Sequence, residues 1–158
     1  MKRIMIIGCG GTGKSTLAKR LHQITAMPVH HLDKYFWLPN WTEIDRTEWQ
    51  KVNQEIIQNS TWIMDGNYGS TMDMRLDAAD TVIFLNRPWW VSLSRVIIRT
   101  FKSYGKTRVD MSKGCPERFE LKFLHYIFMY NKTRRPGILK KLAALPKDKT
   151  VYILKNDK

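Results

Sequence analysis

The stretch GCGGTGKS, from Gly8 to Ser15, follows directly after the apolar run RIMII at residues 3–7. It fits the pattern G-x-x-x-x-G-K-[S/T], whose glycines let successive backbone N–H groups surround a phosphate. Residues 16–24 then place apolar side chains at helical spacing. A buried strand, a glycine loop and a helix in this order are typical of a nucleotide-binding phosphate loop, because the positive end of the helix faces the anion.

The last residues of the loop have distinct chemical roles. Lys14 places a point charge on the outer phosphates, and Ser15 offers a hydroxyl to Mg²⁺. We therefore predict that the loop binds ATP and Mg²⁺ and that Lys14 also acts in catalysis. The predicted nucleotide-binding residues are Gly8, Cys9, Gly10, Gly11, Thr12, Gly13, Lys14, Ser15 and Thr16.

Short apolar strands alternate with helices along the rest of the chain. We expect strands at residues 29–32, 61–64, 81–85 and 151–154, and helices at residues 45–58, 88–103, 116–130 and 136–145. This alternation favours an α/β fold with three layers, a parallel sheet with helices on both faces. A length of 158 residues favours a single domain spanning residues 1–158.

Two carboxylates follow predicted strands. Asp65 stands where P-loop proteins commonly direct a carboxylate toward Mg²⁺, although a turn-forming Asp-Gly pair is the alternative. Asp33 would accept the proton of an acceptor hydroxyl or hold Mg²⁺, and the alternative is a helix cap. Because ligands of parallel sheets bind beyond the carboxyl ends of the strands, we expect both carboxylates to share a crevice with the glycine loop.

The positive charge of the protein lies in its second half. Residues 1–86 carry 9 Lys or Arg and 9 Asp or Glu, whereas residues 87–158 carry 18 and 5, which accounts for the formal net charge of +13. We expect residues 105–117 to form an open, mobile, basic lid with little apolar content to anchor it, which closes over bound phosphates. A solvated cationic face is the alternative. The predicted catalytic arginines are Arg95, Arg99, Arg108 and Arg118.

Four blocks of the chain carry a resemblance to a known family: RIMIIGCGGTGKSTLA at residues 3–18, HLDKYFW at 31–37, WIMDGNYGSTMDMRL at 62–76 and GKTRVDMSKGCPERF at 105–119. They resemble the bacterial DNA topology modulation proteins, which belong to the adenylate-kinase-related P-loop families. The resemblance implies a five-stranded parallel sheet of order 2-3-1-4-5 with a small lid between two helices. It also implies that the acceptor binds beside Asp33.

The turn after residue 65 departs from the nucleotide-kinase pattern. Asn67 and Tyr68 replace the Phe-Pro-Arg that follows Asp-Gly in those enzymes, so the arginine that would grip a monophosphate is missing. Arg75 would hold an acceptor phosphate or carboxylate, and a surface arginine is the alternative. The predicted acceptor contacts are Asp33, Asn67, Tyr68 and Arg75, and the predicted metal ligands are Ser15 and Asp65.

These features favour an ATP-dependent kinase that acts on a small-molecule or nucleotide acceptor. The alternative is a nucleic-acid-associated protein that modulates DNA topology, binds non-specifically through its basic C-terminal half and uses ATP as a switch or ligand. Aromatic residues such as Trp89, Trp90 and Phe119 lie among the basic ones, but their helical spacing is more typical of a core. No Asn-Lys-x-Asp string follows a strand, which disfavours a GTPase switch.

Membrane and zinc chemistry are not expected. No apolar run approaches the roughly 20 residues that a membrane span needs, and the N-terminus lacks the long apolar region of a signal peptide. Cys9 and Cys115 have no metal-ligand spacing. We therefore expect a cytoplasmic protein without membrane contact.

Overall fold

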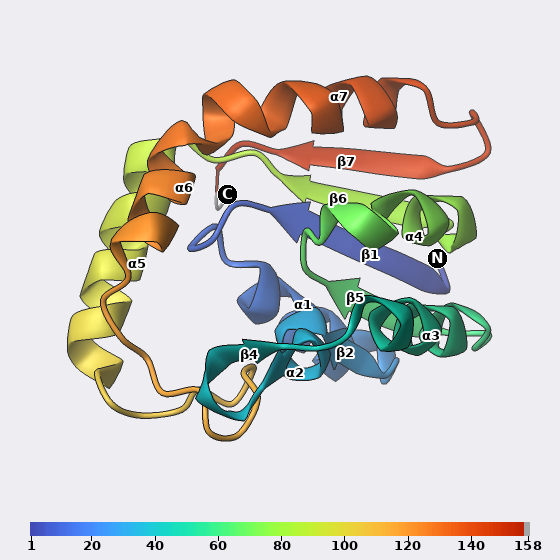
Figure 1. The fold of residues 1–158 in the computed structure, drawn as a ribbon. Coiled ribbons are helices and arrows are strands. Elements are labelled where there is room, and N and C mark those ends of the chain that lie inside the picture. The colour runs from blue at the N-terminus through green and yellow to red at the C-terminus, as the bar shows by residue number, and fades with distance from the viewer. Residues whose placement is uncertain (157–158) are drawn as a thin grey trace.

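The computed structural model describes residues 1–156 and has a five-stranded parallel sheet at its centre (Figure 1). Its strands, in chain order, are β1 (Arg3–Gly8), β2 (Val29–His31), β5 (Trp62–Asp65), β6 (Thr81–Leu85) and β7 (Thr150–Leu154). They lie side by side in the order β2-β5-β1-β6-β7. Counted along the chain within this sheet alone, the order is 2-3-1-4-5, and the predicted α/β fold is confirmed.

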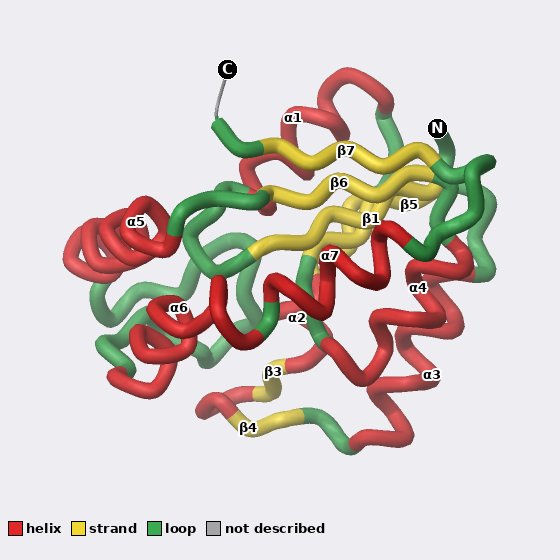
Figure 2. Tube along the Cα trace, turned by 90° about the horizontal axis from the view of Figure 1, so that it is seen from above, coloured by secondary structure: helices red, strands yellow, loops and turns green. Residues whose placement is uncertain are grey.

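Helices cover both faces of the sheet (Figure 2). One face packs against α1 (Lys14–Thr25), and the other packs against α3 (Arg46–Ile57), α4 (Met72–Ala78), α6 (Leu121–Thr133) and α7 (Arg135–Ala143). The long helix α5 (Trp89–Ser103) lies beyond the carboxyl ends of the strands with α6 (Figure 1).

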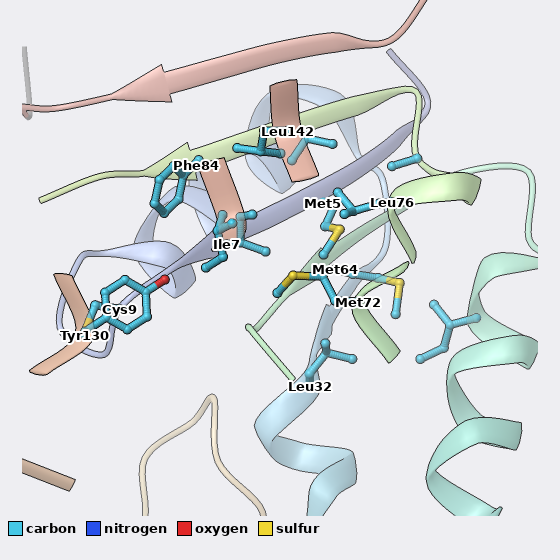
Figure 3. Close-up of a cluster of buried hydrophobic side chains, with 14 of the residues drawn as sticks. Met5, Ile7, Cys9, Leu32, Met64, Met72, Leu76, Phe84, Tyr130 and Leu142 are labelled. Atoms are coloured by element: carbon cyan, nitrogen blue, oxygen red, sulfur yellow. The ribbon is translucent and has the colours of Figure 1, made fainter. Parts of the chain in front are cut away.

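The apolar run of β1 is buried on both sides. Ile4 and Ile6 pack toward α1, whereas Met5 and Ile7 pack into the larger core of the opposite face (Figure 3). All four side chains are fully buried. Alternation of side chains across a strand explains this arrangement, and a strand covered on both faces needs an uninterrupted apolar sequence.

The register of the strands brings polar residues to one edge. Asp65 of β5 is the partner of Ile6 in β1 and of His31 in β2. Gly8 at the end of β1 is the partner of Leu85 at the end of β6. The glycine loop, Asp65 and the residues after β2 therefore begin at the same level, at the carboxyl edge of the sheet.

Several short elements were not predicted. They are α2 (Leu32–Phe36), the hairpin of β3 (Trp37–Leu38) and β4 (Thr42–Glu43), the 3₁₀ turns η1 (Pro39–Trp41) and η2 (Gly69–Thr71), and α4. Strands of two residues are too short to show a period of two, so alternation could not reveal the hairpin. The start of α3 was predicted correctly, since the Asp45 carboxylate accepts hydrogen bonds from the backbone N–H groups of Thr47 and Glu48 at 2.8 and 3.3 Å.

The predicted helix at residues 116–130 begins too early, because α6 starts only at Leu121. Glu117 instead pairs with the start of the lid: its N–H donates to the carbonyl of Lys106, and its carbonyl accepts from the N–H of Gly105, both at 2.9 Å. These bonds hold the chain extended where helix was expected.

No helix within residues 1–156 is long and apolar enough to cross a membrane. The thiols of Cys9 and Cys115 are free and buried.

Candidate active site

A cavity of about 1010 Å³ opens at the carboxyl edge of the sheet. Its walls come from the glycine loop, α2, the turn after β5, α5, the lid and α6. The predicted site residues that line it are Gly8, Gly10, Gly11, Gly13, Lys14, Ser15, Thr16, Asp33, Asp65, Asn67, Tyr68, Arg95, Arg99, Arg108 and Arg118. Cys9 and Thr12 are buried within the loop instead of lining the cavity.

The glycine loop is shaped by close contacts that exclude side chains. Gly11 has φ +77°, and a Cβ at this residue would stand 2.4 Å from the carbonyl oxygen of Ser92 in α5. Gly13 has φ +97° and precedes α1. Both residues adopt a backbone conformation that residues with side chains rarely adopt.

The side chain of Lys14 folds back onto the glycine loop. Its ammonium donates to the carbonyl oxygens of Gly8 at 2.9 Å and Cys9 at 2.8 Å. Burial lowers the pKa of Lys14, while the carboxylates of Asp33 and Asp65 act to raise that pKa. The cation is thus held at the centre of the loop with two carboxylates near it.

The carboxylate of Asp33 accepts a short hydrogen bond of 2.5 Å from the Tyr68 hydroxyl. Burial raises the pKa of Asp33, and the Tyr68 hydrogen bond and the charge of Lys14 counteract that rise. The Tyr68 ring packs against Phe36 and Trp49, with ring centroids 4.6 and 4.8 Å away. Aromatic packing therefore fixes the hydroxyl on the carboxylate.

Asp65 lies at the edge of the glycine loop, as predicted, but its hydrogen-bond partner was missed. The ring nitrogen Nδ1 of His31 lies 2.8 Å from a carboxylate oxygen of Asp65. The two residues are direct neighbours in the register of β2 and β5. The predicted strands, residues 29–32 and 61–64, would place Asp33 opposite Asp65 when aligned at their ends, so no signal in the sequence revealed the His31 partner.

Asn67 joins the glycine loop to α6. Its side-chain oxygen accepts from the N–H of Gly8 at 2.9 Å, and its side-chain nitrogen donates to the hydroxyls of Tyr126 and Tyr130, each at 3.3 Å. The residue lines the cavity, and its role as an acceptor contact remains a prediction.

Arg75 does not fit either of its predicted roles. The side chain is fully buried and does not line the cavity. Its guanidinium donates to four backbone carbonyls, those of Gly66 at 2.9 Å, Asn67 at 2.7 Å, Tyr68 at 2.9 Å and Thr71 at 3.3 Å. Burial lowers the pKa of Arg75 to about 9. This arginine therefore stabilises the turn that carries Asn67 and Tyr68, and its effect on the site is indirect.

The lid is anchored, which corrects the prediction that no core contact holds it. Met111 and Cys115 are buried at 8% and 1% exposure. Hydrogen bonds join the lid to the hairpin region: Asn40 N to Gly114 O at 3.0 Å, Cys115 Sγ to Leu38 O at 3.2 Å, and Trp41 Nε1 to Pro116 O at 3.2 Å. In this structure the lid lies against β3 and the η1 turn.

A buried carboxylate also holds two of the predicted catalytic arginines. Glu117 is 7% exposed and accepts from Arg99 at 3.0 and 3.2 Å and from the Thr100 hydroxyl at 3.0 Å. Arg108 pairs with its other oxygen at 3.1 Å. The repulsion between these two lid-facing cations is therefore offset by Glu117, a residue that was not among the predicted site residues.

The other two predicted arginines, Arg95 and Arg118, also line the cavity. Arg118 is half exposed, and its guanidinium stands 5.2 Å from the centre of the Trp41 ring, a cation–π contact. Arg95 lines the cavity from α5, one turn before Arg99.

No protein-family model matches the chain. The uncharacterized protein YqaC of Bacillus subtilis (strain 168) is 32% identical over 108 residues, which are 66% of this chain and 60% of that protein. The match thus spans about 60% of the length of this curated relative.

Solved structures resemble the chain over almost its whole length. Shikimate kinase from Bacteroides thetaiotaomicron has a TM-score of 0.60 at 19% identity, covering 99% of this chain and 87% of its own. The chain has the fold of the P-loop kinases. Shikimate kinase from Acinetobacter baumannii, in complex with shikimate, has a TM-score of 0.60 at 16% identity, covering 100% and 85%. Deoxyadenosine kinase from M. mycoides has a TM-score of 0.51 at 12% identity, covering 96% and 89%.

Proposed function

We propose that the protein is an ATP-dependent phosphotransferase that acts on a small-molecule acceptor. The observation that carries the proposal is the meeting of three groups in one cavity: Lys14 of the phosphate loop, the buried carboxylate of Asp33, and the paired arginines Arg99 and Arg108. Phosphoryl transfer needs these parts, because charge must be neutralised on the phosphate oxygens while an acceptor hydroxyl loses its proton. The P-loop kinase fold supports the proposal.

The nucleotide would lie along the glycine loop. Backbone N–H groups of the loop and the N-terminus of α1 receive its phosphates. Lys14 would exchange its two carbonyl partners for phosphate oxygens, and Arg99 and Arg108 would face the transferred group from α5 and the lid. Arginines stabilise the charge that spreads over the phosphate oxygens during transfer.

Hard oxygen donors at the loop fit magnesium. Ser15, Asp65 and Asp110 all line the cavity, and hydroxyl and carboxylate oxygens are the ligands that Mg²⁺ prefers. Within residues 1–156 no group of three or more His, Cys, Asp or Glu side chains is placed to hold a metal ion by itself. Magnesium would enter this site with the nucleotide, where it neutralises phosphate charge.

Asp33 would act as the base. It takes the proton of the acceptor hydroxyl, the hydroxyl oxygen bonds to the γ-phosphorus, and the bridging oxygen leaves with ADP. Trp37 and Trp41 line the same cavity and offer apolar walls for the acceptor. The Tyr68 hydroxyl, bonded to Asp33, holds the carboxylate in place.

Titration of ATP with Mg²⁺ into the wild-type protein and into Lys14→Ala tests the nucleotide site. We expect Lys14→Ala to lose at least about tenfold in affinity, since it removes the cation at the centre of the loop. Lys51→Ala, which removes an exposed cation paired with Glu48 on α3, is the control and should bind as the wild type does. Equal affinities in Lys14→Ala and wild type would mean that the loop is not the ATP site.

Exposed aromatic side chains support a second candidate, binding of nucleic acid. Trp90 is 58% exposed, Phe101 71% and Phe119 43%, which corrects the prediction that Trp90 and Phe119 belong to the core. Basic residues of α5 and the lid lie near them in the chain, and bases stack on aromatic rings beside cations. Binding through phosphates should weaken steeply as salt rises from 50 to 200 mM. A protein that binds no DNA at 50 mM salt would contradict this candidate.

A further inference from the structure

Strand β2 ends on two histidines that have different partners. The Nδ1 atom of His30 lies 2.9 Å from the hydroxyl of Tyr35, which belongs to α2. The Nδ1 atom of His31 lies 2.8 Å from the Oδ1 atom of Asp65. Successive side chains of a strand point to opposite faces, so only one of the two neighbouring histidines reaches this carboxylate. One specific imidazole therefore contacts the residue that we assign to magnesium.

The pairing of the strands fixes this contact. His31 and Asp65 are partners in the parallel register of β2 and β5, and each is the last residue of its strand. Both side chains are nearly enclosed, with 11% of the His31 side chain and 4% of the Asp65 side chain exposed. Little solvent competes for the hydrogen bond at this exposure. The contact therefore rests on the sheet and not on a loop.

The chemistry of the two groups decides which atom carries the proton. An ionised carboxylate can only accept hydrogen bonds, so the Nδ1 atom of His31 is the donor. The bond engages Oδ1 of Asp65 and leaves Oδ2 outside this pair. Asp65 lines the cavity together with Lys14 and Ser15, whereas His31 is not among the described residues that line it. His31 can therefore act on a ligand in the cavity only through Asp65.

A carboxylate that is held in one orientation binds a cation better than one that rotates. The terminal torsion of an aspartate is broad, so an unpaired carboxylate samples many directions. A hydrogen bond to one of its oxygens narrows that range, and such partners of metal ligands raise metal affinity. His31 also directly precedes α2, whose first turn carries Asp33. The same imidazole thus joins the segment with the proposed base to the strand with the proposed metal ligand.

We propose that His31 is a positioning residue of the magnesium site: its Nδ1–H group holds one oxygen of Asp65 and presents the other to the cation that accompanies the nucleotide, directly or through a water ligand. This inference rests on the proposed function. The glycine loop and Lys14 receive the phosphates of ATP whether or not the metal is present. Loss of the imidazole should therefore weaken metal binding far more than it weakens the binding of metal-free nucleotide.

The variant His31→Leu removes the donor and keeps a side chain of comparable size. In the presence of ATP, we expect its affinity for Mn²⁺ to fall about 10–100-fold, the effect typical of losing the partner of a metal ligand. Electron paramagnetic resonance of Mn²⁺ measures this affinity directly. Calorimetric titration of ATP in EDTA measures nucleotide binding without metal, and that affinity should stay close to the wild-type value.

Two further single variants separate the hydrogen bond from the packing of the imidazole. His31→Asn places an amide N–H group near the position of Nδ1, so it should restore most of the Mn²⁺ affinity. His30→Leu is the matched control, because it removes the neighbouring imidazole, whose partner is Tyr35. This control should bind Mn²⁺ as the wild type does.

A double variant guards against loss of the fold. His31→Leu leaves a buried carboxylate without its partner, which can destabilise the protein. The same substitution is therefore also made in Asp65→Asn, where no charge is left unpaired. Because the group through which His31 acts is then missing, His31→Leu should cause no further loss of Mn²⁺ affinity in this background.

Three results would overturn the inference. Wild-type affinity for Mn²⁺ in His31→Leu would show that the imidazole does not position the carboxylate. An equal loss of affinity with Mn²⁺ and in EDTA would show that His31 only supports the fold of the site. A further loss in the Asp65→Asn background would show that His31 acts by another route. A wild-type protein that binds no ATP under either condition would instead refute the proposed function and this inference with it.

Discussion

At Asp33, opposing influences set the proton affinity of the residue that we assign as the base. Burial raises its pKa, and the hydrogen bond from Tyr68 and the charge of Lys14 lower it. A carboxylate acts as a base only in its ionised form, and these two neighbours favour that form. Burial and Asp33 together raise the pKa of Tyr68, so this residue stays a hydrogen-bond donor.

Removal of the Tyr68 hydroxyl should shift the pH dependence of transfer. In Tyr68→Phe, a contribution that lowers the pKa of Asp33 is lost, so that pKa rises further. The acidic limb of the kcat/KM profile should move to higher pH, and the loss of activity should be larger at pH 6 than at pH 8. Tyr35→Phe removes a hydroxyl of α2 that contacts His30 at 2.9 Å, and it should leave the limb in place. A limb that stays unshifted in Tyr68→Phe would contradict the role of Tyr68.

Individual site residues can be predicted from the sequence where a local motif defines them. The phosphate-loop motif predicts the conformation of the loop. The positions of Asp33 and Asp65 after predicted strands indicate that both carboxylates lie at the carboxyl edge of the sheet. The partners of these residues could not be predicted, since Tyr68 reaches Asp33 through a turn that buried Arg75 shapes. Arg75 itself was predicted as an acceptor contact or a surface residue, because nothing local marks a guanidinium that is bonded to backbone carbonyls.

Among the elements, the lid differs most from its prediction. Its basic composition suggested mobility, yet Met111 and Cys115 are buried and Cys115 donates to the carbonyl of Leu38 in the hairpin. The carboxylate of Glu117 ties the lid to Arg99 and Thr100 of α5. An isolated Met or Cys in a basic segment gives no periodic signal, and the hairpin that covers it has strands of two residues. The contact between the two elements is visible only in three dimensions.

Loss of the Glu117 charge should loosen the lid. In Glu117→Gln, the repulsion between Arg99 and Arg108 is no longer offset, and breaking a buried ion pair is strongly destabilising. We expect trypsin to cut after Arg108 at least about tenfold faster than in the wild type, which corresponds to about 1.4 kcal/mol of easier opening. Saturating ATP and Mg²⁺ should slow the cut, since phosphates replace the lost carboxylate.

The control for this experiment is Glu120→Gln, which removes an ion pair of 3.8 Å between half-exposed side chains of Arg118 and Glu120. Such pairs contribute little, so the digestion rate should match that of the wild type. A lid in Glu117→Gln that resists trypsin as well as the wild type would mean that its apolar anchors alone keep it closed.

On the scale of the whole molecule, the two halves of the chain differ in charge, and both contribute residues to one cavity. The first half of the chain supplies the carboxylates of Asp33 and Asp65, and the basic second half supplies the arginines of α5 and the lid. The strand pattern predicted the edge of the sheet where these groups meet, and the charge distribution predicted an anionic ligand. The size of the cavity and the aromatic residues around the space proposed for the acceptor could be identified only from the three-dimensional structure.

The most direct test of the account is phosphoryl transfer from γ-labelled ATP to a panel of nucleosides, nucleotides, sugars and small acids, measured for wild type and Asp33→Asn. We expect the wild type to transfer label to at least one acceptor. We also expect a loss of roughly 10²–10⁴-fold in Asp33→Asn, the usual effect of removing a general base, while ATP affinity is kept. Transfer by Asp33→Asn at the wild-type rate, or a wild type that binds ATP and transfers label to no acceptor of the panel, would contradict the account.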